Sequence, residues 1–258
     1  MNRDIVNRHD AITGSDQRSQ AVDIVKIIDS IKTINIDFII CDCAFCFISS
    51  IKNNTLILID NLYLFTMSKI QKTDHFYLID GSGYIFRAYY ALPPLSRKSD
   101  GLPTGAVSGF CSMLFKLLED SKSIENLKKP THFAVIFDSA RKTFRNEIYS
   151  DYKANRAEAP DDLAPQFEYI RKSVLAFNLP SVELLNYEAD DLIATYVDQI
   201  LKKGAKVTIV SSDKDLMQLF KKDVRIFDPM KNKFISEEDV KNKFGVDPSK
   251  VIDVQALA

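Results

Sequence analysis

Short β-rich runs alternate with helical patterns from His75 to the end of the chain, and this alternation constrains the fold more than any other feature. The predicted strands lie near Phe76–Asp80, His132–Asp138, Ser181–Leu184, Lys206–Ser211 and Val224–Phe227. The clearest predicted helix spans Glu188–Lys203 and ends before Gly204, and another is expected over Val107–Leu118. The pattern predicts an α/β fold with a mainly parallel central sheet and helices on both faces.

Turn-forming residues divide the chain into two unequal parts. All nine prolines lie beyond residue 92, and seven of the eight glycines lie beyond residue 80. We interpret residues 1–66 as an N-terminal extension outside the fold. It holds a predicted helix over Ala21–Ile36. We interpret its three cysteines, at 41, 43 and 46, as small buried side chains; the alternative is a soft-metal site. Met67 is the expected natural start, so the domain is predicted to span residues 67–258.

Charge and cysteine content exclude several classes of protein. The 34 lysines and arginines against 35 acids give a net charge of -1, so a polyanion must be held by a local basic patch. Four cysteines in 258 residues do not form a disulfide framework. Runs of 18 or more uncharged apolar residues, which could span a bilayer, are missing from the sequence. We therefore expect a cytoplasmic protein with no membrane partner.

Acidic residues follow the predicted strands or open the best helix. Because ligand sites in parallel sheets form beyond the carboxyl ends of the strands, these acids are expected at one rim. The set is Asp80, Asp138, Glu188, Asp190, Asp191, Asp213 and Asp215. Each acid alone has a structural explanation, as a turn former, a helix cap or a partner of the helix dipole. Together, clustered carboxylates repel one another unless cations neutralise them, which indicates bound metal.

Oxygen ligands select hard ions, so Mg²⁺ is expected, with Mn²⁺ as a substitute. The three histidines lie outside the acidic segments, which argues against a zinc site or a histidine-activated nucleophile. Two such ions about 4 Å apart are the usual apparatus for in-line displacement at a phosphodiester: one activates water and the other stabilises the leaving oxygen. The acids therefore favour a two-metal phosphodiester hydrolase.

The basic segment, residues 139–156, interleaves basic and aromatic side chains directly after Asp138. We interpret it as a DNA-binding segment in which cations contact phosphates and rings stack on bases. Its candidates are Arg141, Lys142, Phe144, Arg145, Tyr149, Tyr152, Lys153 and Arg156. The structural alternative is a solvated amphipathic helix. Arg87 is a further candidate phosphate contact, and its alternative is an arginine that extends from a helix into solvent.

Five segments in this order resemble the 5′ nuclease, or flap endonuclease, domain found at the amino end of bacterial DNA polymerase I. They are LIDGSGYIFRAY from Leu78, FDSARKTFR from Phe137, YKANR from Tyr152, YEADD from Tyr187 and SSDKDL from Ser211. The resemblance covers residues 75–258. It implies a PIN-like fold in which the basic segment forms a helical arch around a single-stranded 5′ end.

The resemblance also implies roles for individual residues. The seven acids would bind the metal ions or their water shell. Arg87, Lys153 and Arg156 would engage the scissile phosphate, with Lys153 and Arg87 as the catalytic residues, and Tyr152 would position the end of the substrate. The implied substrates are 5′ flaps, nicked duplexes and RNA-primed DNA, cut during replication and repair.

The family pattern continues with two more metal-site aspartates and a helix-hairpin-helix, and this sequence ends before both. We therefore expect one metal site to be incomplete, and a separate chain carrying the helix-hairpin-helix and polymerase regions is a candidate partner. Two other functions stay open: a DNA-junction binding module that does not cleave, and a PIN-type ribonuclease.

Overall fold

The computed structural model describes residues 70–123 and 129–257. The predictions made for residues 1–66, and the expected start at Met67, lie outside the described residues.

The core of the domain is one six-stranded sheet. Its strands are β1 His75–Asp80, β2 His132–Ile136, β3 Ser181–Val182, β4 Lys206–Val210, β5 Val224–Asp228 and β6 Lys233–Phe234. The strand order is β3-β2-β1-β4-β5-β6, and all neighbours are parallel except β5 and β6, which are antiparallel. The five predicted strands are confirmed, although β2 and β3 end two residues early. The two-residue β6 is too short to leave a pattern in the sequence.

Helices connect the strands. They are α4 Gly81–Ala91, α5 Gly105–Ser123, α6 Phe144–Ile148, α7 Gln166–Ala176, α8 Ala189–Lys202, α9 Glu237–Phe244 and α10 Val251–Leu257, with 3₁₀ turns η2 Asp215–Leu219 and η3 Pro248–Lys250. The best predicted helix is α8, and Glu188 is its N-cap. The helix predicted over Val107–Leu118 is α5, which extends further at both ends.

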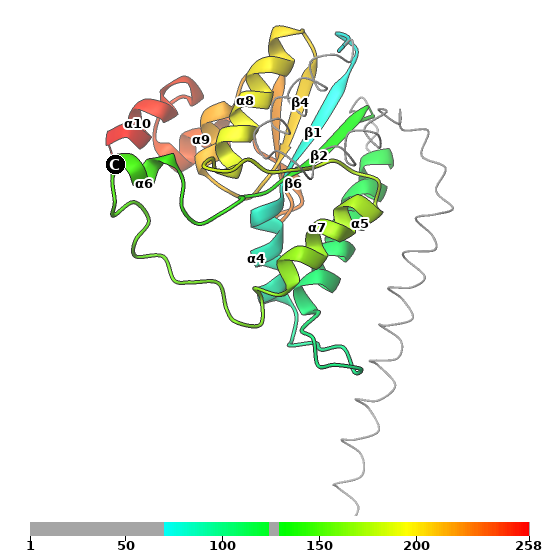
Figure 1. The fold of residues 1–258 in the computed structure, drawn as a ribbon. Coiled ribbons are helices and arrows are strands. Elements are labelled where there is room, and N and C mark those ends of the chain that lie inside the picture. The colour runs from blue at the N-terminus through cyan, green and yellow to red at the C-terminus, as the bar shows by residue number, and fades with distance from the viewer. Residues whose placement is uncertain (1–69, 124–128, 258) are drawn as a thin grey trace, which may run out of the picture. The chain divides into compact units, whose positions relative to one another are not determined.

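Helices pack against the mainly parallel sheet, as predicted. On one face, alternate residues of β1 and β4 such as Leu78 and Ile209 pack with the apolar stripe of α8, which includes Ile193 and Val197. Helices α4, α5 and α7 group together away from α8, α9 and α10 (Figure 1). Among the described residues we find no helix with the length and apolar character needed to cross a membrane.

The expected helical arch is shorter than the resemblance implied. Within residues 139–165, α6 is the one helix, and turns follow it over residues 149–156. The five residues of α6 include no buried side chain, and Ile148 is 80% exposed. Short helices depend on tertiary packing for their stability. Because α6 has no buried face, packing does not stabilise further helical turns in this segment.

Candidate metal centre and nucleic-acid interface

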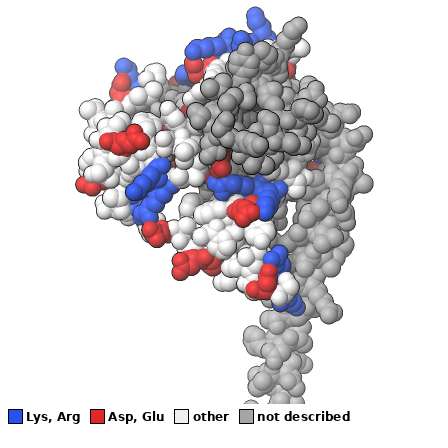
Figure 2. Space-filling model, in the orientation of Figure 1, with Lys and Arg blue, Asp and Glu red and all other residues white. Residues whose placement is uncertain are grey.

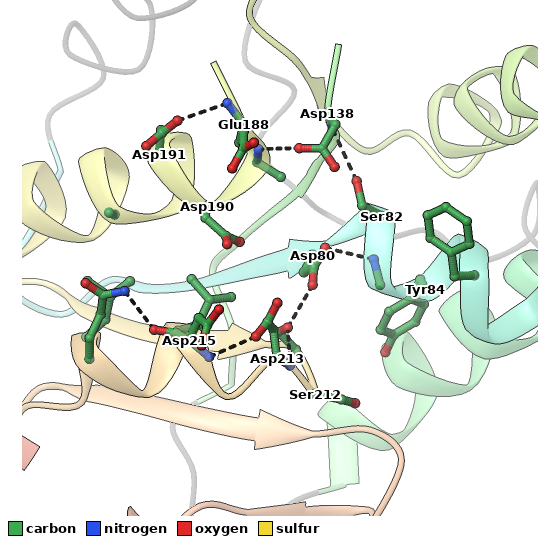
Figure 3. A pocket seen from close by; sticks show the side chains of 18 of the residues that line it. Asp80, Ser82, Tyr84, Asp138, Glu188, Asp190, Asp191, Ser212, Asp213 and Asp215 are labelled. Carbon is green, nitrogen blue, oxygen red and sulfur yellow. Dashed lines mark hydrogen bonds between the residues drawn. The ribbon is translucent and has the colours of Figure 1, made fainter. Parts of the chain in front are cut away.

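A pocket of about 920 Å³ lies at the carboxyl edge of the sheet, and all seven predicted acids line it (Figure 3). The acids come from separate elements: the end of β1, the residues after β2, the start of α8 and the turn after β4. Parallel strands bring these ends together, which is why acids up to 135 positions apart in sequence line one pocket. Five predicted nucleic-acid contacts line the same pocket: Arg87, Arg145, Tyr152, Lys153 and Arg156.

Asp80 is fixed at the junction of β1 and α4. It caps α4: its Oδ1 accepts the backbone N–H of Gly83 at 2.9 Å, and its Oδ2 accepts the Ser211 hydroxyl at 2.8 Å. A Cβ at position 83 would stand 2.7 Å from Asp80 Oδ2, so this turn needs glycine. The side chain is 6% exposed, and burial is the main cause that raises the pKa of Asp80, with the charges of Asp138 and Asp213 adding to it.

Asp138 joins three elements. Its Oδ1 accepts the backbone N–H of Ala189 at 2.8 Å, which ties the end of β2 to the first turn of α8. Its own backbone N–H donates to the Ser82 hydroxyl at 3.2 Å, and its carbonyl accepts a guanidinium N–H of Arg171 at 3.0 Å. These bonds hold the Asp138 carboxylate beside Asp80 and the acids of α8.

Asp213 and Asp215 lie in a compact turn rather than an extended chain. The Asp215 backbone N–H donates to Asp213 Oδ1 at 2.8 Å, and η2 begins there. Both still line the pocket, and Gln255 of α10 donates to Asp215 Oδ1 at 2.9 Å.

The first turn of α8 points its neighbouring acids in different directions. Asp190 points into the space near Asp80 and Asp213 (Figure 3). Asp191 instead accepts the Glu188 backbone N–H at 3.0 Å, in a capping box, and takes two bonds of 2.7 Å from Arg145. These bonds to Arg145 are the main reason that the pKa of Asp191 is lowered.

Asp190 has a strongly raised pKa. Burial raises its pKa to about 7, and the charges of Asp80, Asp213 and Asp138 contribute in that order. Lys153 opposes the shift but does not cancel it. Negative charge therefore accumulates in this part of the pocket beyond what the cations of the chain neutralise.

We expect the metal-free protein to lose stability as the pH rises from about 4 to about 7. In that window the unfolded chain has released the Asp190 proton, whereas the folded chain, with a pKa of about 7, still binds it. Each pKa unit is about 1.4 kcal/mol, so the loss approaches about 4 kcal/mol at neutral pH. Thermal unfolding in a chelator at pH 5 and pH 7.5 measures it. Asp190→Asn should flatten the dependence, and an unchanged dependence in that variant would contradict the assignment.

The donor set fits a hard divalent cation. The acids around Asp190 offer oxygen ligands only. A bound cation would offset the repulsion between the Asp190 carboxylate and its neighbouring carboxylates. Asp80, Asp138, Asp190 and Asp213 are the residues that would hold it. Among residues 70–123 and 129–257, no three Asp, Glu, His or Cys side chains already form a closed coordination group, so the carboxylates would have to draw together around the ion.

The basic residues divide into two groups. Lys153 Nζ donates to Glu188 Oε1 at 2.8 Å, and the Tyr152 hydroxyl donates to Glu188 Oε2 at 3.3 Å, so both stand at the acidic rim. Arg141 instead bonds Glu158 and the carbonyl of Arg156. The pocket lining does not include Arg141, Lys142 or Phe144. On the face drawn in Figure 2, basic and acidic side chains are interspersed.

Sequence reasoning did not single out several residues that shape the site. Ser82 and Ser211 donate or accept hydrogen bonds that hold Asp138, Asp80 and Asp213. Asp228 is a buried acid at the end of β5, and its Oδ1 accepts the Ser212 hydroxyl at 3.0 Å. The pattern of acids that follow strands would have found Asp228, because it comes directly after the predicted strand.

The fold and the pocket define an α/β domain with an acidic pocket at the carboxyl edge of a mostly parallel sheet and basic residues on its rim. Residues 75–245 match the family described as "5'-3' exonuclease, N-terminal resolvase-like domain", and the chain belongs to this family. The resemblance inferred from the five sequence segments is thereby confirmed.

Two relatives show how this domain is used elsewhere. DNA polymerase I of Rhizobium leguminosarum is 57% identical over 190 residues, which cover 74% of this chain and 19% of the polymerase. A 5'-3' exonuclease of Aquifex aeolicus is 42% identical over 181 residues, which cover 70% of this chain and 60% of the relative. The chain therefore spans a part of the length of each relative.

Solved structures with the same fold come from bacteriophage T5. The T5 5'-exonuclease with bound zinc is 21% identical with a TM-score of 0.53, over 70% of this chain and 65% of the other. The T5 flap endonuclease in a complex with DNA and metal ions is 22% identical with a TM-score of 0.54, over the same shares. These likenesses establish the PIN-like fold of the chain.

Proposed function

We propose that this chain is a divalent-metal-dependent 5′ nuclease that hydrolyses phosphodiesters in DNA with a 5′ flap or nick, including RNA-primed DNA. Mg²⁺ is the proposed ion, two ions are the proposed number, and Mn²⁺ is a substitute. The observation that carries the proposal is the convergence of seven acids in one pocket that Lys153, Arg87 and Arg156 also line. We place this activity in the cytoplasm, in replication and repair.

The acidic and the basic residues of the pocket would have different roles in the reaction. Bound at the acids, the ions would supply an activated water and neutralise charge on the phosphate. Asp80, Asp138, Asp190 and Asp213 would hold them, with Glu188 and Asp215 as the further proposed ligands. Lys153, Arg87 and Arg156 would bind the scissile phosphate.

Aromatic side chains at the rim would position the bases. Tyr152 lines the pocket beside Lys153, and Phe86 lines it with 43% of its surface exposed. Base–aromatic stacking tolerates any sequence, because every base has a π-face. This fits an enzyme that selects the structure of its substrate rather than its sequence. Arg141, Lys142, Phe144 and Arg145 complete the DNA-binding residues proposed from sequence.

The polymerase regions are the proposed functional neighbours of the domain, in the same chain or in a separate one that carries the helix-hairpin-helix. The support is that this domain makes up 19% of the DNA polymerase I of R. leguminosarum. A DNA-junction binding module is the second candidate function, and the acids that stand apart without forming a closed group favour it.

Cleavage of end-labelled substrates separates these functions. We expect the protein to cut a 5′-flap duplex in Mg²⁺ or Mn²⁺ and to leave it intact in a chelator. A junction binding module would bind the flap in Ca²⁺ but release no product in Mg²⁺. A preference for RNA without cleavage of flap DNA would support a PIN-type ribonuclease instead.

A further inference from the structure

We propose that Arg145 and Asp191 form a positioning pair that anchors the basic segment to the first turn of α8, instead of acting as a phosphate contact and a metal ligand. The inference rests on the proposed function, because the anchored segment carries Lys153. It assigns to both residues a role different from the one that their sequence positions predicted.

The geometry of the pair is that of a specific bidentate bond. Arg145 Nη1 and Nη2 each lie 2.7 Å from one oxygen of Asp191. Asp191 Oδ2 also accepts the Glu188 backbone N–H at 3.0 Å. The side chains are 30% and 23% exposed, so solvent weakens the bond only in part. Planar bidentate pairs of this kind fix orientation as well as charge.

The direction of Asp191 separates it from the metal cluster. In Figure 3, Asp190 points into the space near Asp80, whereas Asp191 turns to the backbone of Glu188. The charges of Asp80, Asp213 and Asp138 raise the pKa of Asp190 and Lys153 opposes them, whereas the charges that act on Asp191 are the cations Arg145 and Lys153. Neighbouring acids on one helical turn therefore have different partners.

Further contacts link the Arg145–Asp191 pair to Tyr152, the residue before Lys153. The Arg145 guanidinium lies 4.7 Å from the centre of the Phe144 ring and 5.8 Å from that of Tyr152, while Asn146 Nδ2 donates to the Tyr152 carbonyl at 3.1 Å. Lys153 then reaches Glu188 at 2.8 Å.

Besides the pair, Tyr152 and Lys153 bond Glu188, and the Phe144 ring lies 5.4 Å from the Tyr187 ring. The segment is tied at its start, where the Phe144 N–H donates to the Asn186 carbonyl at 3.0 Å. Helix α6, however, buries no side chain in the core. The bidentate pair therefore contributes orientation that apolar packing supplies elsewhere in the fold.

The test compares Arg145→Gln, Asp191→Asn and the double variant, with Asp198→Asn as a matched control on the exposed side of α8. Chymotrypsin cleavage after Tyr152 reports how well the segment is held. Mn²⁺ binding followed by electron paramagnetic resonance reports metal ligation, with Asp80→Asn as the reference for a lost ligand. Flap cleavage provides kcat and KM.

We expect each single variant to raise the rate of chymotrypsin cleavage and to lower kcat by about tenfold, and the double variant to do no more, because the two residues act as one unit. Asp191→Asn should bind as much Mn²⁺ as the wild type, and Arg145→Lys should restore part of kcat. Effects that multiply in the double variant, or loss of Mn²⁺ in Asp191→Asn as in Asp80→Asn, would overturn the proposal. If the wild type cleaves no flap DNA, the proposed function fails, but the protease and Mn²⁺ measurements still decide the role of the pair.

Discussion

Asp80→Asn is expected to reduce Mg²⁺-dependent flap cleavage by about 10³-fold, which is about 4 kcal/mol of transition-state stabilisation. Asparagine keeps the shape of the side chain, so its amide oxygen can still accept the Gly83 N–H that caps α4. What it loses is the negative charge at the end of β1, next to Asp138 and Asp213. The fold should therefore persist while cation binding fails.

Single-turnover cleavage at saturating DNA measures this effect, and circular dichroism confirms that the variant is folded. Asp198→Asn is the matched control, because Asp198 lies on the same helix as Asp190 but pairs with Lys202 at the exposed surface. That control should cut at the rate of the wild type. Cleavage by Asp80→Asn within tenfold of the wild-type rate would remove Asp80 from the metal centre.

Lys153→Ala is expected to lower kcat by about 10²-fold, because under the proposed function it removes a cation that would stabilise the charge developing on the phosphate. The Lys153 ammonium stands 2.8 Å from Glu188 at the rim of the pocket. The backbone complicates a simple alanine substitution, since Lys153 has a φ of 55° and is therefore in the left-handed region that favours glycine.

A pair of variants separates charge from backbone. Lys153→Gly removes both the charge and the strain of a positive φ, whereas Lys153→Arg keeps the charge and the same backbone conformation. If the ammonium matters, the glycine variant should be as slow as the alanine variant, and the arginine variant should recover part of kcat. A glycine variant with wild-type turnover would show that the conformation of the turn, and not the cation, accounts for the loss.

Much of the fold and of the acidic pocket follows from sequence for a simple physical reason. Parallel strands joined by helices place their carboxyl ends at one edge, so an acid after each strand, such as Asp80 or Asp138, is located by the strand alone. The same rule would have located Asp228. Burial of α8 was equally predictable, because its apolar residues recur at helical spacing.

The partners of individual side chains were not predictable in this way. Arg145 and Asp191 are 46 positions apart, and their bond depends on how the chain after β2 returns to α8. Asp190 and Asp191 are adjacent in sequence, and successive residues of a helix point in different directions, so spacing alone does not say which one faces Asp80. The short α6 reflects missing apolar packing, which the basic and aromatic composition of the segment did not reveal.

Anomalous diffraction from crystals soaked in Mn²⁺ tests most directly whether the acids at the carboxyl edge of the sheet bind divalent ions. The account predicts an anomalous peak in the pocket, within ligand distance of carboxylate oxygens of Asp80, Asp190 and Asp213, and loss of that peak in Asp80→Asn. A map with peaks elsewhere on the molecule, and none among these three aspartates, would contradict it.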